Sequence, residues 1–373
     1  MKALFVLHES KFIYGANRSI SELLKAVDYD FDILICESFT VKVDEAEIRN
    51  LCGKHLQKIY ICWLPRYRVY HYDRLGVIQE LSHIVNNAMA WLFAKKRKKI
   101  IKQGNYDYVH LNSVVLFPVL DNSAAYIMHV REITNPDYYN IKNFIKKMQK
   151  ASGVICIDEV TKKALEQIMP DLKNLVLNNP FNMLGLAETN YEESLQQYGL
   201  SADNTIFALI GRVTEGKGAK LVIGAFMRQQ NDKSRLLIVG NANHAYGKEC
   251  QEMAKEDKRI IFCGELKDTR GIYRISDYII RGDADIGIGR TMYEGLYAGA
   301  GIIIPGSIEN LQFFPEKERF KEKIFFYPLS NEMELCHIIE KQSQVKQTDR
   351  QLYSNVEEYI KKYKKYINEV IGN

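Results

Sequence analysis

Residues 205–228 read TIFALIGRVTEGKGAKLVIGAFMR, and this stretch decides the fold. The segment 205–210 is almost entirely apolar and contains β-branched and aromatic side chains, which predicts a buried strand. Glycines at 211, 216 and 218 then predict a tight turn. From Ala219 to Arg228, apolar residues recur at helical spacing. A strand, a glycine-rich turn and a helix in this order form the repeating unit of a parallel α/β sheet.

Strand-like and helix-like segments alternate in this way along most of the chain. In the first half, the predicted strands are 2–7, 31–36, 58–62, 106–110, 124–129, 153–157 and 172–177. The predicted helices between them are 17–27, 44–52, 75–102, 141–150 and 159–169. In the second half, the predicted strands are 205–210, 235–239, 259–263, 277–280, 301–304 and 323–326. This alternation predicts an α/β protein with doubly wound parallel sheets.

Turn residues and a polar stretch divide the pattern into two parts. Asn178-Asn179-Pro180 is typical of a turn, and the following residues are polar to about residue 203. We therefore expect an N-terminal α/β domain over 1–182 and a C-terminal α/β domain over 183–348. The Tyr-, Lys- and Glu-rich end, 349–373, predicts a helix that can pack back across the domains.

The composition excludes several classes of protein. With 373 residues, 46% hydrophobic and 26% charged, the chain is ordinary for a globular protein and is not disordered. Its 51 basic and 46 acidic side chains give a net charge of +5, too little to indicate a nucleic-acid partner. Seven cysteines without a C-x-x-C pair favour reduced thiols in a cytoplasm. The apolar run Ala3–Leu7 is too short for a signal peptide, and no run approaches the roughly 18 apolar residues of a membrane span.

The glycine-rich turn 211–218 predicts a phosphate site. It precedes a helix, where backbone N–H groups and the positive end of the helix dipole favour anions, and Arg212 and Lys217 add full charges. An exposed turn with solvated cations is the alternative. The segment also nearly matches a P-loop, but Gly218 stands where Ser or Thr would bind magnesium, which argues against an ATPase.

Three further helix starts or strand ends carry candidate site residues. Residues 287–299, GIGRTMYEGLYAG, open a helix in which Glu294 could reach a ligand hydroxyl such as that of a ribose, although it could equally complement the helix dipole. Gly15, in YGANRS at 14–19, opens a helix after the first strand. His129 ends a predicted strand, where function and core filling are both plausible. The eight histidines show no spacing typical of a metal site, so no metal is expected.

In their order along the chain, these features resemble the group 1 glycosyltransferases, which are retaining, nucleotide-sugar-dependent enzymes. The resemblance implies a GT-B fold, in which two Rossmann-type domains face a cleft. Besides the segments above, it rests on the following pieces: SGVICID at 152–158, LNNP at 177–180, LIVG at 237–240 and IFCG at 261–264.

The resemblance implies roles for second-domain residues. Arg212 and Lys217 match the basic pair that grips the donor diphosphate during catalysis. Glu294 matches the acid that binds the nucleotide ribose. The helix-opening residues that meet the phosphates or the sugar through their backbone are Gly289, Arg290 and Thr291.

Roles in the first domain follow from the same resemblance. Gly15 matches a loop that approaches the donor, and His129 matches a catalytic histidine near the transferred sugar. The implied donor is a nucleoside-diphosphate sugar, in particular a UDP-sugar, with no bound cofactor or metal. The implied acceptor is a glycan or a lipid-linked molecule bound by the first domain, in polysaccharide or glycoconjugate synthesis of the bacterial type.

One departure from the family pattern leaves alternatives open. The family carries two acids with seven residues between them; the second matches Glu294, but Ile286 stands at the first position, with Asp285 beside it. Gly282-Asp283 likewise replaces the usual Pro-Ser. A non-catalytic GT-B binding or partner subunit is therefore an alternative, as is a nucleotide-sugar epimerase.

A basic segment suggests where such an enzyme works. Trp91–Lys102 reads WLFAKKRKKIIK and combines aromatic and aliphatic residues with six basic ones. Such a helix can lie on an anionic membrane surface, which would suit a lipid-linked acceptor. The same composition also fits a solvated basic face over a core stripe. The expected location is cytoplasmic, with peripheral contact to the inner face of the membrane as the further expectation.

Overall fold

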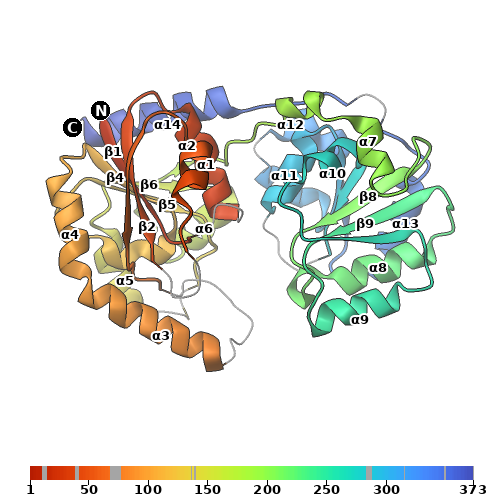
Figure 1. Cartoon of the computed structure of the whole chain (residues 1–373), viewed down its shortest axis with the longest axis horizontal. Helices are drawn as coiled ribbons and strands as arrows, with labels where there is room; N and C mark the ends of the chain where they lie inside the picture. The colour runs from red at the N-terminus through yellow and green to blue at the C-terminus, as the bar shows by residue number, and fades with distance from the viewer. Residues whose placement is uncertain are drawn as a thin grey trace. The chain divides into compact units, whose positions relative to one another are not determined.

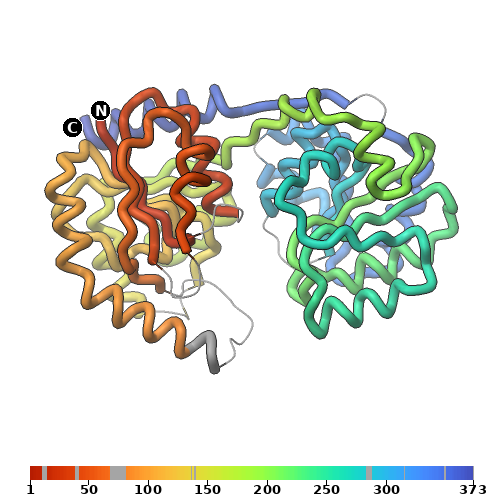
Figure 2. Tube along the Cα trace, viewed as in Figure 1, coloured from red at the N-terminus to blue at the C-terminus, as the bar shows by residue number. Residues whose placement is uncertain are grey.

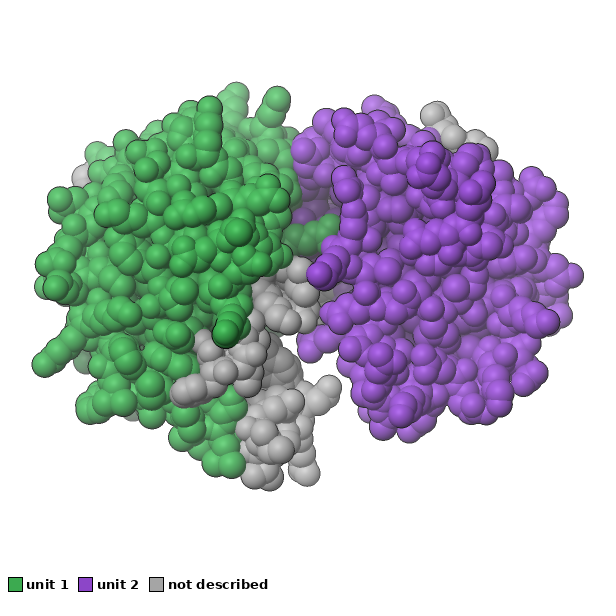
Figure 3. All heavy atoms as spheres, in the orientation of Figure 1, with its two compact units in different colours: residues 1–180, 355–373 green, residues 181–354 purple. Residues whose placement is uncertain are grey.

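The computed structural model describes residues 1–10, 15–37, 42–67, 77–135, 137, 140–282, 288–314, 316–347 and 350–372. The chain divides into two compact units (Figure 3). Unit 1 comprises Met1–Pro180 and Asn355–Asn373, and unit 2 comprises Phe181–Ser354. The last helix of the sequence therefore belongs to the same unit as the first strand.

Unit 1 is built on a seven-stranded sheet in the order β3-β2-β1-β4-β5-β6-β7, in which every pair of neighbours is parallel (Figure 1). Its strands are β1 (Lys2–Leu7), β2 (Asp30–Cys36), β3 (Leu56–Cys62), β4 (Tyr108–Leu111), β5 (Tyr126–Val130), β6 (Gly153–Cys156) and β7 (Leu175–Val176). The strand order reverses between β1 and β4. In open α/β sheets, ligands bind beyond the carboxyl ends of the strands at such a switch point.

Helices cover both faces of this sheet. They are α1 (Gly15–Ala26), α2 (Glu45–Cys52), α3 (Val77–Leu92), α4 (Ala94–Gln103), α5 (Ile141–Met148), α6 (Glu159–Glu166) and α14 (Val356–Ile371), with a 3-10 helix η1 (Val114–Val119). Tyr359, Tyr363 and Ile367 of α14 lie in one apolar cluster with Phe5 of β1 and Leu23 of α1. Figure 2 shows the chain's last helix returning to the part that carries the N-terminus. Because the central strands, such as β1, are covered on both faces, their sequences are nearly continuously apolar, whereas the edge strand β3 has exposed residues.

The single helix predicted for 75–102 is wrong in one respect, because the structure forms two helices that break at Phe93. Phe93 has φ −87° and ψ 8° and carries no side-chain cap. The buried guanidinium of Arg97 donates to the carbonyl of Ala90 at 3.0 Å and of Trp63 at 3.3 Å. Arg97 therefore satisfies a carbonyl near the end of α3, which stabilises the break.

Unit 2 is built on a six-stranded sheet in the order β10-β9-β8-β11-β12-β13, again with all pairs parallel. Its strands are β8 (Thr205–Ile210), β9 (Ser234–Val239), β10 (Ile260–Gly264), β11 (Tyr278–Ile280), β12 (Gly301–Pro305) and β13 (Ile324–Tyr327). The switch point lies between β8 and β11. These two strands precede the two glycine-rich segments found in the sequence.

The helices of unit 2 also lie on both faces of its sheet. They are α7 (Tyr191–Gln196), α8 (Ala219–Arg228), α9 (Ala245–Met253), α10 (Arg270–Ile275), α11 (Arg290–Tyr297), α12 (Lys317–Phe320) and α13 (Glu332–Gln342), with 3-10 helices η3 (Leu184–Glu188), η4 (Glu215–Lys217), η5 (Ile308–Phe313) and η6 (Lys321–Lys323). One apolar cluster joins α10 and α11 to the sheet, and another joins α8 and α13 to it. The predicted doubly wound α/β architecture is confirmed in both units.

Candidate functional site

The loops that follow β8 and β11 meet at the carboxyl edge of the unit 2 sheet. A Cβ built on Gly218 would lie 1.9 Å from the carbonyl oxygen of Gly282, and one built on Gly282 would lie 2.3 Å from that of Gly218. The two backbones are therefore in direct contact, and neither position has room for a side chain. This contact brings the turn 211–218 beside Gly282, two residues after the end of β11.

Gly218 also has a left-handed conformation, with φ +61° and ψ 31°, at the start of α8. A residue with a Cβ is strained there even without a neighbour. The absence of the P-loop Ser or Thr at this position thus has a structural reason. The turn is built for close backbone approach and not for a hydroxyl ligand to magnesium.

The residues that end or follow β9 and β10 lie at the same carboxyl edge of the unit 2 sheet. The N–H of Gly211 donates to the carbonyl of Val239 at 2.9 Å, and that of Gly240 to the carbonyl of Gly264 at 2.8 Å. A Cβ on Gly240 would lie 1.9 Å from the carbonyl oxygen of Gly211. The ends of β10, β9, β8 and β11 therefore form one backbone-lined edge.

Arg212 and Lys217 are both exposed on the turn after β8. Lys217 ends η4, one residue before the Gly218 contact. Because both side chains are exposed and lie next to a helix start, an anion that arrives from solvent can reach them.

The start of α11 supplies the second half of this candidate site. Gly289 is its N-terminal cap, and Arg290 and Thr291 are its first helical residues. A Cβ on Gly289 would lie 3.6 Å from Nη1 of Arg281, the residue that follows β11. The buried Arg281 side chain therefore lies against the helix start.

Glu294 lies one turn into α11 and is only 2% exposed. Its Oε1 accepts a hydrogen bond from Nε of Arg290 at 2.9 Å, and its Oε2 accepts one from the Tyr273 hydroxyl at 2.7 Å. The Arg290 guanidinium lies 5.2 Å from the ring centre of Phe181, which fixes its plane. Glu294 is thus held in one orientation by groups on α10 and α11.

Sequence reasoning missed three residues of this arrangement. Arg281 follows the carboxyl end of a predicted buried strand, a position that could have flagged it. Tyr273 and Phe181 lie on other elements, and their contacts with Glu294 and Arg290 depend on tertiary packing that leaves no local signal.

In unit 1, Gly15 begins α1, and a Cβ there would meet no atom of the described residues within 4 Å. Nδ2 of Asn112, which follows β4, donates to the carbonyl of Ala16 at 3.2 Å. The helix start is therefore tied to the switch point between β1 and β4. Tyr14, quoted in the same motif, lies outside the described residues.

His129 is fully buried in β5. Its Nδ1 lies 3.2 Å from Nε2 of His110 and 3.2 Å from Nη2 of Arg131. Its Nε2 has no hydrogen-bond partner among the described residues. Burial, together with the charge of Arg131 and the neighbouring His110, holds the pKa of His129 well below its usual range. The imidazole is therefore neutral at physiological pH.

Arg131 is held in turn by the residues around it. Its Nε donates to Oδ1 of Asn112 at 2.9 Å, and its Nη1 donates to Oδ1 of Asn179. These contacts connect the ends of β4 and β5 with the segment after β7, so the carboxyl edge of unit 1 is rich in polar groups.

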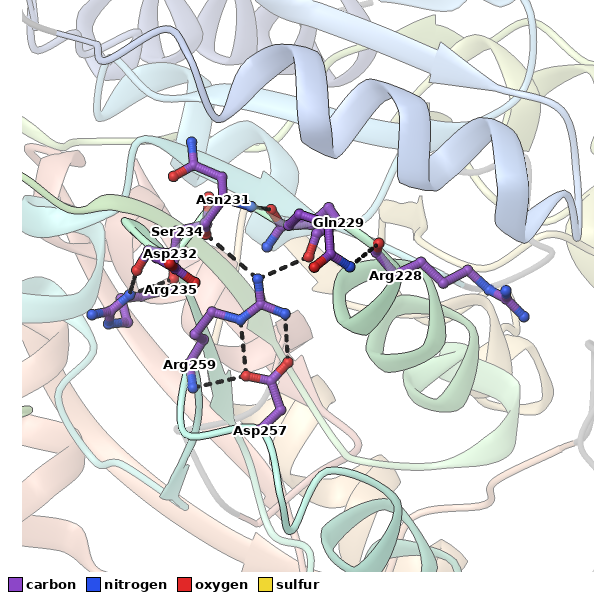
Figure 4. Close-up of polar contacts among 9 residues, drawn as sticks. Arg228, Gln229, Asn231, Asp232, Ser234, Arg235, Asp257 and Arg259 are labelled. Carbon is purple, nitrogen blue, oxygen red and sulfur yellow. Dashed lines mark hydrogen bonds and ion pairs between the residues drawn. The ribbon is translucent and has the colours of Figure 1, made fainter.

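A polar hollow of about 690 Å³ lies at the opposite, amino edge of the unit 2 sheet. It is lined by Thr205, Asn231, Lys233, Ser343 and Lys346, among others. Beside it, the Arg259 guanidinium donates two hydrogen bonds to the Asp257 carboxylate, from Nη2 at 2.7 Å and from Nε at 2.9 Å (Figure 4). Its Nη1 donates to the carbonyl of Gln229 at 2.8 Å. None of the sequence-predicted site residues lines this hollow.

Two sequence observations fall outside the described residues, namely Ile286 with Asp285, and Asp283. Within the part of the chain that the structure describes, no group of three or more His, Cys, Asp or Glu side chains could hold a metal ion. Over the same residues, no helix combines the length and apolar character needed to cross a membrane.

Comparison with solved structures identifies the fold. HepE from Anabaena, crystallised with UDP and glucose, aligns with a TM-score of 0.69 at 16% identity, over 98% of this chain and 98% of that one. A glycosyltransferase from Rickettsia africae aligns with a TM-score of 0.66 at 17% identity, over 100% and 99%. Sucrose-phosphate synthase from Thermosynechococcus elongatus aligns with a TM-score of 0.66 at 14% identity, over 100% and 96%.

These likenesses show the fold, which is the GT-B fold, as predicted. A scan against models of protein families finds no match, and a search of curated proteins finds none either.

Proposed function

We propose that the protein is a glycosyltransferase that moves a sugar from a UDP-sugar to an acceptor, with retention of configuration and without a bound metal. The observation that carries this proposal is the backbone contact between Gly218 and Gly282, which places the Arg212–Lys217 turn beside the end of β11, where the Arg281 side chain lies against the start of α11. The GT-B fold, shared with a protein crystallised with UDP-glucose, supports it. In this proposal unit 2 binds the donor and unit 1 binds the acceptor.

The chemistry follows from where charge develops. As the glycosidic bond breaks, the leaving UDP gains negative charge on its diphosphate. Arg212, Lys217 and the N–H groups at Gly289, Arg290 and Thr291 would then interact more strongly with it than with the intact donor. Positive groups that are already in place provide this stabilisation without a metal ion.

Glu294 would accept hydrogen bonds from the ribose hydroxyls with a carboxylate that Arg290 and Tyr273 hold in place. We propose that Gly15, at the start of α1, lets a backbone loop approach the donor, and that His129 contacts the transferred sugar. These roles rest on the resemblance noted in the sequence.

Calorimetric titration with UDP tests the donor site. Arg212→Gln and Lys217→Gln should each weaken UDP binding by about 10- to 100-fold, because a hydrogen bond to a charged group contributes about 1.5–3 kcal/mol. Lys341→Gln, at an exposed position on α13 of the same unit, is the matched control and should leave the affinity unchanged. Equal affinities in all four proteins would contradict the site.

A UDP analogue without its ribose hydroxyls tests Glu294 separately. The wild type should prefer UDP to this analogue, and Glu294→Gln should reduce that preference. An unchanged preference would exclude Glu294 from ribose binding, whatever the phosphate site does.

Turnover distinguishes the proposal from its alternatives. A panel of UDP-sugars is offered with glycan and lipid-linked acceptors, and UDP release is measured; NMR of the anomeric proton of the product reports configuration. Tight UDP binding without release across the panel would favour a non-catalytic GT-B subunit, for which Ile286 is the motivating residue. A changed sugar without any acceptor would favour an epimerase.

For location, we propose that α3 and α4 of unit 1 contact an anionic membrane from the cytoplasmic side, next to a lipid-linked acceptor. Helix α3 carries apolar residues at the spacing of one helical face, yet that face is exposed. Its exposed apolar residues are Leu81 at 57%, Ile84 at 64%, Val85 at 44%, Trp91 at 77% and Leu92 at 63%. The adjoining α4 exposes Lys95, Lys96, Lys98, Lys99 and Lys102.

An exposed apolar stripe beside a row of lysines fits an anionic lipid surface. The apolar side chains can insert among the acyl chains, and the lipid phosphates attract the lysines. The buried Arg97 does not belong to this surface, although the sequence placed it in the basic segment.

Sedimentation with phosphatidylglycerol vesicles tests this surface. Replacing Lys95, Lys98 and Lys99 by Gln should weaken binding about 100-fold, because each lysine near such a surface contributes about 1 kcal/mol. The control replaces Lys361, Lys362 and Lys365, exposed on α14 of the same unit, and changes the net charge equally. Equal binding by both triple variants would refute the surface, and dimerisation through α3 without vesicle binding would assign the stripe to a second copy.

A further inference from the structure

His129 is the end of a chain of largely buried polar side chains that begins at Tyr29 and passes through Tyr363 of α14. The distances between neighbouring polar atoms are Tyr29 Oη–Tyr108 Oη 2.6 Å, Tyr108 Oη–Tyr363 Oη 3.2 Å, Tyr363 Oη–His110 Nδ1 2.9 Å and His110 Nε2–His129 Nδ1 3.2 Å. Arg131 joins at its far end, with Nη2 3.2 Å from the same Nδ1 of His129. Elements far apart in sequence, including α14, thus converge on one imidazole.

The directions of these hydrogen bonds follow from Arg131. A guanidinium can only donate, so Nδ1 of His129 must accept. His129 is neutral, because burial and Arg131 hold its pKa well below the usual range, and its single proton must then lie on Nε2. The alternative tautomer would set an Nδ1–H against the Arg131 donor.

The same reasoning continues along the chain. Because Nδ1 of His129 carries no proton, Nε2 of His110 must donate to it. Burial also keeps His110 neutral by lowering its pKa, so its Nδ1 accepts from the Tyr363 hydroxyl. Tyr363 then accepts from Tyr108, and Tyr108 from Tyr29. This assignment gives every contact a donor and an acceptor, with Arg131 and His110 sharing the single lone pair on Nδ1 of His129.

We infer that Arg131, His110 and Tyr363 are positioning residues that hold His129 as its Nε2–H tautomer, a hydrogen-bond donor and not a base. The buried Nε2–H has no partner among the described residues, and an unpaired buried donor is costly. It therefore suits an oxygen acceptor that arrives with the substrate, such as a sugar hydroxyl or a phosphate oxygen. This inference rests on the proposed function and gives His129 a defined role in it: orienting the sugar without taking up a proton.

The tautomer can be read directly, without substrate and without activity. Long-range proton–nitrogen NMR of protein labelled with ¹⁵N-histidine distinguishes the two neutral tautomers and the cation for each ring, and His129→Gln identifies the signals of His129 by their loss. We expect an unprotonated Nδ1 and a protonated Nε2 from pH 5.5 to 8. An Nδ1–H tautomer, or a cationic ring at pH 7, would overturn the inference.

A variant tests the positioning role in the same spectra. Arg131→Met removes the donor that forces Nδ1 of His129 to accept and should let His129 and His110 populate both tautomers. A single unchanged His129 tautomer in the folded Arg131→Met protein would overturn the part assigned to Arg131.

Kinetics with the UDP-sugar then test the donor role. The amide of His129→Gln can still donate near the former Nε2, whereas His129→Phe keeps volume without a donor. We expect kcat/KM to fall about tenfold in His129→Phe and by less than about threefold in His129→Gln. Equal losses in both variants would overturn the donor role, and an inactive wild type would refute the proposed function while leaving the tautomer measurement intact.

Discussion

Replacing Gly218 by Ala should separate the two loops on which the donor site depends. The new methyl group would lie 1.9 Å from the carbonyl oxygen and 2.1 Å from the carbonyl carbon of Gly282, both backbone atoms that cannot rotate away. Overpacking of this kind costs about 1–3 kcal/mol, and the left-handed conformation at φ +61° costs a further 1–2 kcal/mol, roughly. The total loss of stability in unit 2 is about 2–5 kcal/mol.

Gly199→Ala provides a matched control within the same unit. Gly199 has φ +63°, nearly the same conformation, but a Cβ there would meet nothing within 4 Å. Gly199→Ala should therefore lower the stability of unit 2 only by the cost of the left-handed conformation, about 1–2 kcal/mol. The difference between the two variants isolates the contact between the loops.

The assay uses the distribution of tryptophan. Trp63 and Trp91 are the two tryptophans of the chain, and both belong to unit 1. Their fluorescence therefore reports the unfolding of unit 1, while far-UV circular dichroism follows both units. For a unit of this size, each kcal/mol shifts the melting temperature by about 2–4 °C. Gly218→Ala should lower the unit 2 transition by more than Gly199→Ala does and leave the fluorescence transition in place.

UDP binding completes the experiment. Gly218→Ala should weaken UDP binding because it displaces the Arg212–Lys217 turn from the start of α11, and Gly199→Ala should not. If both variants melt alike and bind UDP alike, the contact between the loops does not organise the site and the reasoning fails.

Three further predictions concern other groups. Tyr273→Phe leaves the buried Glu294 with one hydrogen bond fewer and should destabilise unit 2 by about 1.5–3 kcal/mol, measured by circular dichroism; an unchanged melting temperature would show that the contact is unimportant. Burial and the charges of Arg66 and Arg131 lower the pKa of His8 to about 3, so only the unfolded chain gains its proton as pH falls below 6.5. The free energy of unfolding at pH 5.5 is thus about 1 kcal/mol lower than at pH 7. In His8→Gln, urea unfolding followed by fluorescence should show a decrease that is smaller by about this amount. Transfer activity should persist in excess EDTA, since the proposed diphosphate site uses protein cations; activity restored only by a divalent ion would contradict it.

The sequence predicted the strands well because each is a short apolar run between turn residues. The segment 205–210 coincides with β8, and 2–7 coincides with β1. Strand β7 is shorter than predicted, and the break between α3 and α4 was missed, because nothing near Phe93 breaks a helix locally. The break depends on Arg97 reaching back to Ala90, a tertiary contact.

For the candidate site, the sequence located the loops but not their contacts. Glycines after two strands indicated where backbones approach a ligand or each other, and the structure brings Gly218 to Gly282. It could not predict that Tyr273 holds Glu294 or that Tyr363 reaches His110, 253 residues earlier in the chain. Such pairs are set by the order of strands in the sheet and by the return of α14.

The return of α14 to unit 1 has a consequence for how the protein is made. On a ribosome, residues 181–354 emerge before residues 355–372. Unit 2 can therefore complete its folding before unit 1 does, although synthesis of unit 1 begins first. Until then the nascent first unit exposes the apolar faces of Phe5 and Leu23 and lacks the hydroxyl of Tyr363 beside His110. A nascent chain stalled before α14 would therefore be a natural client for chaperones, and a recombinant fragment of unit 1 should carry the last helix fused after Pro180.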